Sequence, residues 1–426
     1  MRRLGIVAAV IGAVLLITSC TAALVRPQSG PCRGASSDLW LAKASASLGV
    51  QPYQPGPAYD VDARGSAVAV PTLKPAAGAM AVQSYPEPDR FAGAPRGFLA
   101  LSSRSFVYDN ALYVLWALQQ GRPAQARAVL LTLQSLQLPE GGWGFSFAFR
   151  EDGFYNAGYL RAGAIAWVVY ALAKYQAATG DLQFAPTLRR GCQWLLQAEG
   201  GTGLLRAGRG RWASDEAFDP DWPADFTATE HQIDGWFALT AAAAADPALA
   251  TELALLAAAA RIREQMLGVL WIHEQGRFAQ GVASGVVDRV SALDASGTWG
   301  ALWAHANGLN DRAAAALDHV SAVHSLDVLG WPGWRPYQPG APETWFVEGS
   351  LARALALQRL GQPELAAKAF GVAVELACAG GVPLVYSPQW AADFPLSPAA
   401  APTLWFLMVG EELRGRPAAL WTERAP

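Results

Sequence analysis

The chain has 426 residues, of which 52% are hydrophobic and only 16% charged, and its formal net charge at pH 7 is −3. A chain without a basic stripe cannot neutralise a run of phosphates, so its composition argues against nucleic acid as a partner. The 17 tryptophans offer large, rigid, half-polar surfaces, which serve in cores and also stack on flat ligand faces such as those of sugars.

The first twenty residues have the layout of a secretory signal. Arg2 and Arg3 precede an uncharged run from Leu4 to Ile17, which is too short to span a bilayer comfortably. The tetrapeptide "ITSC" that ends at Cys20 resembles the lipobox of bacterial lipoproteins, in which this cysteine is lipidated and becomes the mature N-terminus. We therefore expect an extracytoplasmic lipoprotein that is anchored to a bacterial membrane through Cys20. The alternative is an ordinary signal peptide that is cut nearby.

The other cysteines do not indicate a metal centre. Cys32, Cys192 and Cys378 allow at most one disulfide, and no Cys-x-x-Cys or Cys/His spacing is typical of zinc. We expect Cys192 and Cys378 to be inert core thiols. No cofactor and no metal are predicted.

Two regions follow the signal. Residues 21–97 are rich in Ala, Gly, Pro and Ser and predict a tether and an irregular N-terminal wrap, with one helix around Asp38–Leu48. Over residues 98–426, long apolar helices alternate with Gly-rich turns, with prolines near helix starts and glycines just past helix ends. The helices predicted there are Arg104–Gln119, Ala124–Gln137, Tyr159–Thr179, Phe184–Ala198, Thr227–Ala245, Pro247–Trp271, Ala292–Asn307, Arg312–Val323, Glu343–Leu360, Pro363–Cys378 and Ala400–Leu413.

These helices form pairs, in which an apolar first member is followed by a more polar second member and a Gly/aromatic turn such as "PEGGWGF" or "GWPGWRPY". Five such units, together with the early and the last helix, make about six hairpins, and repeats of this period are typical of helical arrays and closed toroids. An open array needs polar terminal helices, but the last helix, "APTLWFLMVG", is as apolar as the inner ones. The fold class predicted is therefore all-α, as a closed ring.

The starts of the first helices are "SFVYDNALYVLWAL", "YLRAGAIAWVVYAL", "TATEHQIDGWFAL", "SALDASGTWGAL" and "ETWFVEGSLARALAL". From about Phe98 to Leu413 this layout resembles the six-hairpin (α/α)6-toroid superfamily of glycoside hydrolases, polysaccharide lyases and sugar epimerases. The resemblance implies an (α/α)6 toroid that handles oligo- or polysaccharide. The stretch "QLPEGGW" also fits the QxxxGxW repeat of triterpene cyclases, whose α-toroid is related. It occurs once, and neither a DxDD nor a DDxxD motif accompanies it.

In a ring of parallel inner helices, all N-termini open onto one face, where unpaired N–H groups and the helix dipoles stabilise acids. Glycoside hydrolysis needs two carboxyl groups across the scissile bond, one as acid and one as base or nucleophile. The predicted catalytic residues are Asp109, Glu230, Asp294 and Glu348. The predicted substrate-binding residues are Tyr108, Trp143, Arg161, Trp167, His231, Asp234, Trp236, Trp299, Trp334 and Trp345.

Structural roles compete with these assignments. Thr227-x-x-Glu230 and Ser291-x-x-Asp294 have the form of capping boxes, whereas capping cannot explain Asp234 or Asp109 within apolar helices. Arg161 would pair with one of the acids. The outer residues expected to be solvated are His305, His319 and His324.

Three functions therefore remain open. A glycoside hydrolase is favoured, because an acidic mouth suits a neutral sugar. A polysaccharide lyase would need a base and cations, for which His231, Tyr108 and Arg161 are available. The third alternative is a non-catalytic glycan-binding or envelope-assembly lipoprotein, which is favoured if every acid is held in an arginine pair or a helix cap.

Overall fold

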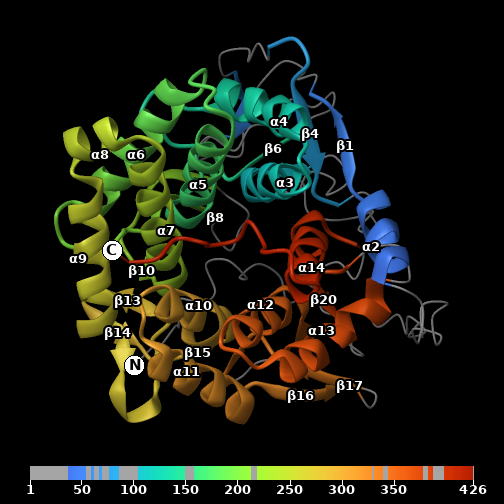
Figure 1. Ribbon diagram of the computed structural model, residues 1–426. Coiled ribbons are helices and arrows are strands. Elements are labelled where there is room, and N and C mark those ends of the chain that lie inside the picture. Colours follow the sequence, from blue (N-terminus) through green and yellow to red (C-terminus); the bar gives the residue numbers. More distant parts are fainter. Residues whose placement is uncertain are drawn as a thin grey trace.

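The computed structural model of the protein describes residues 37–53, 59–61, 67–69, 76–85, 104–148, 158–212, 218–328, 331–338, 344–377, 382–386 and 398–425. Its helices stand in two concentric layers around a common axis (Figure 1). The signal sequence and Cys20 lie outside the described residues, as does Cys378. Within the described part of the chain, none of the helices has the length and hydropathy that a bilayer span requires.

The inner layer is a closed ring. Consecutive inner helices pack side by side, and the last packs against the first, as seen down the axis in Figure 1. The prediction of a closed (α/α)6 toroid is thereby confirmed. The inner helices are α3 (Val107–Gln119), α5 (Ala162–Thr179), α7 (Thr229–Ala245), α10 (Trp299–Ala306), α12 (Val347–Arg359) and α14 (Ala400–Leu413).

The outer helices are amphipathic and cover the ring with their apolar faces. The early helix α2 (Ser37–Ala46) packs against α13 and α14 and completes the sixth hairpin. The helix predicted over Pro247–Trp271 is broken at Ala254, whose left-handed φ of 52° separates α8 from α9. The outer helices are α4 (Pro123–Leu136), α6 (Ala185–Glu199), α8 (Pro247–Leu253), α9 (Leu255–Gly268), α11 (Asn310–Val323) and α13 (Pro363–Ala377).

Short antiparallel strand pairs tie the hairpins together at the rim where the inner helices begin. In five hairpins the strand before the inner helix pairs with a strand after the outer helix. These pairs are β5 (Arg104–Phe106) with β6 (Ser146–Ala148), β7 (Leu160–Arg161) with β8 (Gly208–Trp212), β10 (Thr227–Ala228) with β13 (Gly281–Ala283), β15 (Ser291–Ala292) with β18 (Tyr337–Gln338), and β19 (Trp345–Phe346) with β20 (Val385–Tyr386). Because the residues before them are extended, the inner helices of these five hairpins begin later than the sequence predicted, whereas α14 begins at Ala400 as predicted.

The remaining strands lie in loops between hairpins or in the N-terminal region. They pair as β1 with β4, β2 with β3, β8 with β9, β11 with β12, β13 with β14 and β16 with β17. Their bounds are β1 (Gly49–Pro52), β2 (Tyr59–Val61), β3 (Ala67–Ala69), β4 (Met80–Gln83), β9 (Phe218–Ala224), β11 (Trp271–Ile272), β12 (Arg277–Phe278), β14 (Val286–Asp288), β16 (Ser325–Val328) and β17 (Trp331–Trp334). A 3-10 turn, η2 (His273–Gln275), links β11 and β12.

The fourth inner helix begins as a π-helix, η3 (Leu293–Thr298), and continues as α10. A Cβ on Gly297 would lie 1.8 Å from Val320 Cγ2 of α11, so only glycine permits this approach of the two helices. Single π-turns inside helices are frequent at functional sites, and this one carries Asp294.

The C-terminal segment, residues 414–425, crosses the ring at the ends of the inner helices (Figure 1). Arg359 of α12 donates to the carbonyl oxygens of Leu420 at 2.7 Å and Trp421 at 2.9 Å. The Ala425 N–H donates to the carbonyl of Ala306, at the end of α10, over 3.0 Å. The segment therefore closes the centre of the ring opposite the rim with the helix N-termini.

Candidate active site

The second residue of the first helical turn is acidic in three successive inner helices. These residues are Glu230 in α7, Asp294 in η3 and Glu348 in α12. The equivalent positions in α5 and α14 hold the small residues Gly163 and Ala401. The acids therefore come to a common rim, as the parallel arrangement of the inner helices predicted.

None of these acids belongs to a capping box, although Asp294 Oδ1 accepts from the Ala295 N–H in the first turn of its own helix. The residues that precede the helices are extended and have no side-chain capping bond. Thr227 Oγ1 has no hydrogen-bond partner, and Ser291 Oγ is bonded to His319 Nε2 at 2.8 Å and His324 Nε2 at 2.7 Å. The predicted capping boxes are therefore wrong, because the residues meant to cap belong to β10 and β15.

Glu230 and Asp294 form a hydrogen-bonded carboxyl pair. Burial, the neighbouring charge of Asp294 and that of Glu348 raise the pKa of Glu230 to about 8. The pKa of Asp294 is also raised by burial, against the opposing effect of its bond from the Ala295 N–H, 2.7 Å long. Both side chains are only partly buried, and Glu230 exposes 36% of its side chain. Glu230 is thus a protonated acid within reach of solvent.

Glu348 lies in a network that joins three helices. The Tyr108 hydroxyl of α3 donates to Glu348 Oε1 over 2.9 Å, and the indole N–H of Trp405 in α14 donates to that hydroxyl over 2.7 Å. Burial raises the pKa of Glu348 to about 8, and the nearby carboxyl of Asp109 adds to the shift. Its second oxygen, Oε2, is buried without a partner.

Asp109, in the first turn of α3, is 5% exposed and hydrogen-bonded to Ser84. Burial raises its pKa to about 7, the lowest value found among the strongly shifted acids of this rim. Near neutral pH a large fraction of Asp109 is therefore ionised, while most of Glu230 keeps its proton.

Asp234 and His231 lie deeper on α7. Burial, Glu230 and Asp294 raise the pKa of Asp234 well above its usual value, and Trp167 hydrogen-bonds it. Burial lowers the pKa of His231 to about 3, so this imidazole is neutral although it lies 3.7 Å from Glu230. His231 Nδ1 and Asp234 Oδ1 are buried without hydrogen-bond partners.

An aromatic cluster lies beneath the acids. Trp167, Trp299 and Trp405 come from three inner helices, and Trp421 comes from the C-terminal segment; their ring centroids are 5.1–6.3 Å apart. Trp405 and Trp421 were missed by the sequence analysis. The sequence does hold a sign of Trp405: it is the sixth residue of α14, the position that Trp167 occupies in α5.

Four predicted substrate-binding residues lie elsewhere. Trp143 is fully buried and donates to the Leu133 carbonyl of an outer helix over 2.6 Å. Trp345 donates to Ser350 Oγ over 2.7 Å, Trp334 packs against Arg353, and Trp236 lines a different cavity. Trp143, Trp334 and Trp345 therefore have packing contacts of their own, and Trp236 lines that other cavity; a sugar-binding role for the four stays a prediction.

Within the described part of the chain, Arg161 forms no ion pair with an acid. Its guanidinium donates to the backbone carbonyls of Leu160, Arg209 and Gly210 over 2.7–2.9 Å and stacks 3.8 Å above the Tyr159 ring. The backbone of β7 and β8 therefore holds this cation.

The predicted exposure of the three outer histidines is wrong for His324, which is fully buried and bonded to Ser291 Oγ. His305, in the cavity that Trp236 lines, and His319 are half-buried. Cys192 is buried and unpaired, as expected of a core thiol, and burial raises its pKa to about 12. Among the described residues, no group of three or more His, Cys, Asp or Glu side chains is arranged to hold a metal ion.

No protein-family model and no curated protein matches the chain. Solved structures of similar fold include a wild-type glycosidase, 17% identical with a TM-score of 0.54 over 80% of this chain and 93% of that chain. A D-mannose isomerase is 11% identical, with a TM-score of 0.56 over 88% of this chain and 96% of that chain. A mannosylglycerate hydrolase of glycoside hydrolase family 63 from Thermus thermophilus, in complex with glucose, is 15% identical, with a TM-score of 0.52 over 72% and 93%. The chain thus has the (α/α)6-toroid fold of these sugar-processing enzymes.

Proposed function

We propose that the protein is an extracytoplasmic glycoside hydrolase that cleaves an oligo- or polysaccharide of neutral sugars. The observation that carries this proposal is the meeting of Glu230, Asp294 and Glu348 from three successive hairpins, each with a raised pKa. Among the described residues, no lysine or arginine forms an ion pair with any of the three. Acids locked in caps or arginine pairs would have favoured a non-catalytic glycan binder.

Glu230 is the general acid of this proposal. Its pKa of about 8 keeps it protonated at neutral pH, and its partly exposed side chain can meet a glycosidic oxygen. Asp294 accepts the hydrogen bond that the Glu230 carboxyl donates. Because the two side chains are in direct contact, Asp294 cannot lie on the opposite side of the scissile bond from Glu230. Asp294 therefore positions the acid, and the base must come from another helix.

Asp109 is the base of this proposal, since it ionises at the lowest pH of the strongly shifted acids. Its helix, α3, is separated from α7 by α5 in the ring. Neighbouring helix axes lie about 8–10 Å apart, so alternate axes lie roughly 15 Å apart, with side chains reaching inward from both. An inverting mechanism requires roughly 6.5–9.5 Å between the two carboxyl groups, and Asp109 and Glu230, on alternate helices, are not recorded in contact with each other.

The reaction then runs as a single displacement. Asp109 takes a proton from water as the water oxygen attacks the anomeric carbon, the glycosidic C–O bond breaks, and Glu230 gives its proton to the leaving oxygen. Glu348 and Asp234 keep their protons at neutral pH, and each has a buried oxygen without a partner among the described residues, which suits donation to a sugar hydroxyl oxygen. The aromatic cluster below keeps their surroundings apolar.

A lyase is less well supported. Arg161, whose charge reaches His231, is engaged by backbone carbonyls, and His231 is buried and neutral. A uronate carboxylate would meet several acids, whose repulsion the engaged guanidinium of Arg161 would have to offset.

The proposal is tested by measuring reducing-sugar release from a panel of neutral and acidic glycans by the full chain. The variants Asp109→Asn, Glu230→Gln and Glu348→Gln should each lower kcat/KM on the active glycan by about 10²–10⁴-fold. Glu274→Gln is the matched control, because Glu274 is exposed and paired with Arg289 rather than with any of the three acids. Wild-type activity in all three variants would overturn the site. NMR of the first product should show the inverted anomer.

The two catalytic roles can be separated by the leaving group. The dinitrophenolate group of a dinitrophenyl glycoside leaves without protonation by an acid. Glu230→Gln should therefore hydrolyse this substrate at near wild-type rate, whereas Asp109→Asn should remain inactive. The opposite pattern would exchange the roles of Glu230 and Asp109.

The lipid anchor remains a proposal from the sequence, supported by the lipobox-like "ITSC". Labelling with a radioactive fatty acid in a bacterial host should mark the wild-type chain and the control Cys32→Ala, but not Cys20→Ala. Labelling of Cys20→Ala would contradict the anchor.

A further inference from the structure

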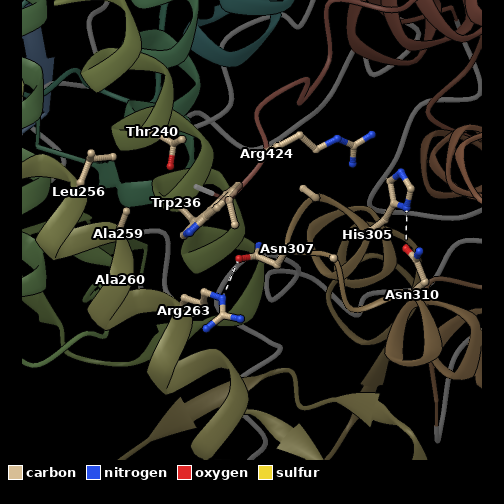
Figure 2. Close-up of a pocket in the computed structure, with 13 residues that line it drawn as sticks. Trp236, Thr240, Leu256, Ala259, Ala260, Arg263, His305, Asn307, Asn310 and Arg424 are labelled. Carbon is tan, nitrogen blue, oxygen red and sulfur yellow. Dashed lines mark hydrogen bonds between the residues drawn. The ribbon is translucent and has the colours of Figure 1, made fainter. Parts of the chain in front are cut away.

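A second recess lies away from the acidic rim. It is a cavity of about 560 Å³ between α7, α9, the end of α10 and the C-terminal segment (Figure 2). None of the rim acids lines it, and the glycosidase proposal assigns it no role. Its size is within the range of small-molecule sites.

The described lining of the cavity holds two arginines, and the nearest acid recorded against it, Glu412, is bonded to Arg359. Arg263 and Arg424 reach it from α9 and from the C-terminal segment, and no acidic residue is part of its described lining. Neither arginine forms an ion pair within the described part of the chain. Arg263 uses its Nε–H to bind Asn307 Oδ1 over 3.0 Å, which holds the guanidinium in place and leaves its terminal N–H groups for a ligand (Figure 2).

Neutral polar groups accompany the two arginines. The Thr240 side chain, on a residue 9% exposed, has a hydroxyl without a hydrogen-bond partner, and it lines the cavity (Figure 2). His305 lies beside Asn310, with Nδ1 2.9 Å from the amide oxygen. A buried hydroxyl without a partner is costly, so a ligand atom that bonds Thr240 would recover that cost.

The remaining wall is apolar. Leu256, Ala259 and Ala260 lie on the face of α9 that also carries Arg263, and Trp236 lies one turn before Thr240 on α7. The last carbonyl groups of α10 accept hydrogen bonds from the protein itself: the Leu309 N–H donates to the Ala304 carbonyl, and the Ala425 N–H donates to the Ala306 carbonyl. The helix end therefore does not offer the cavity a row of unpaired acceptors that would repel an anion.

We propose that this cavity binds a small amphipathic oxyanion, in which a carboxylate or phosphate group is joined to a ring-shaped or apolar body. The oxyanion meets the terminal N–H groups of Arg263, as charge-assisted bonds from guanidinium groups favour, while Arg424, whose guanidinium points toward His305, adds positive charge to the same cavity (Figure 2). The body lies against Trp236 and Leu256. The rim offers carboxyl groups and this cavity offers guanidinium groups, so the two sites select different ligands.

Isothermal titration of the full chain tests this with four probes: phenyl phosphate, benzoate, inorganic phosphate and phenol. Phenyl phosphate or benzoate should bind with one-to-one stoichiometry, at least about tenfold more tightly than phenol, which lacks the charge, and than inorganic phosphate, which lacks the body. The comparison of phenyl phosphate with benzoate tells which oxyanion the cavity prefers. Equal binding of phenol, or no binding of either charged aromatic probe, would overturn the proposal.

Variants locate the binding. Arg263→Met should weaken the better charged probe at least about tenfold, and Arg424→Met, on the exposed segment, serves where the first variant does not fold. Arg289→Met is the matched control, since this exposed arginine pairs with Glu274 elsewhere. Glu230→Gln should bind the probe as the wild type does. Unchanged binding in both cavity variants, or loss in Glu230→Gln, would place the probe outside this cavity.

Discussion

The hydroxyl of Tyr108 donates to Glu348 Oε1 over 2.9 Å, although 240 residues separate the two in sequence. The bond joins α3, the first inner helix, to α12, the fifth, and Trp405 of α14 fixes the hydroxyl from the other side. This carboxylate is therefore positioned only when the ring has closed. Its geometry depends on the whole toroid rather than on any one hairpin.

Tyr108→Phe should consequently reduce activity while leaving the fold intact. The change removes the donor to Glu348 Oε1, and kcat/KM should fall by about 10- to 100-fold, the usual worth of a bond to an ionisable group. Tyr113→Phe on the same helix is the control, because that hydroxyl bonds only Gln125 of the outer layer, over 3.2 Å. Equal kinetics for the two variants, with matched melting curves, would remove Tyr108 from the site.

The pH dependence of kcat/KM should be a narrow bell. Below about pH 7 Asp109 gains a proton and is lost as base, and above about pH 8 Glu230 loses the proton that it must donate. Initial rates from pH 4 to 10 on the active glycan measure both limbs. With a dinitrophenyl glycoside, Glu230→Gln should keep the acidic limb and lose the basic one. A plateau that extends from pH 5 to 7 would exclude Asp109 as the base.

Much of the fold could be predicted because its signals are local. Apolar runs, prolines at helix starts and glycines after helix ends marked all eleven helical segments from Arg104 to Leu413, and the apolar last helix predicted closure. The short rim strands could not be predicted in this way. A two-residue strand such as Thr227–Ala228 exists only through its partner, here Gly281 and Val282 more than fifty residues later.

The candidate site was likewise predictable only where the sequence carries a local signal. Acids at parallel helix starts had to meet, and Glu230, Asp294 and Glu348 do. The sequence could not show that backbone carbonyls hold Arg161 or that a tail residue, Trp421, fills the ring. Both depend on contacts between segments far apart along the chain, for which a single sequence carries no local pattern.

Glu348→Gln should stabilise the fold, increasingly so at higher pH. In the native state Glu348 holds its proton to about pH 8, whereas an unfolded glutamate releases it near pH 4.3. Between these values unfolding releases a proton, so the wild type loses stability as pH rises, and the amide does not. Urea unfolding should show that the free energy of unfolding of Glu348→Gln exceeds that of the wild type by about 1–3 kcal/mol at pH 8 and by little at pH 4. A gain that is equal at both pH values would contradict the raised pKa.

Gly163→Ala should damage the site through two side chains of the neighbouring helix. A Cβ at this position would lie 2.6 Å from His231 Cδ2 and 2.8 Å from Asp234 Oδ2, both of them buried. Overpacking of this kind costs about 1–3 kcal/mol, and the displacement of Asp234 should lower kcat as well. Gly371→Ala in α13 is the control, since its Cβ meets nothing within 4 Å. It should raise stability by up to about 1 kcal/mol. If Gly163→Ala and Gly371→Ala both stabilised the fold, α7 would be able to shift and accommodate the added methyl group without a loss of stability.

Trp421→Ala should weaken both the fold and the site, because this one side chain belongs to both. It is 2% exposed, and its ring centroid lies 5.1 Å from those of Trp167 and Phe237. Truncation of a buried tryptophan costs about 3–5 kcal/mol, which urea unfolding measures. Trp167 hydrogen-bonds Asp234, so loss of its packing partner should also lower kcat.

The control for this change is Trp222→Ala, at a partly exposed ring that packs against Arg211 on the surface, with centroid and guanidinium 5.3 Å apart. It should cost about 1 kcal/mol or less and leave kcat unchanged. If Trp421→Ala were no more destabilising than Trp222→Ala, the C-terminal segment would not be part of the core. If it unfolded more easily yet kept full kcat, the aromatic cluster would support the ring without positioning the acids above it.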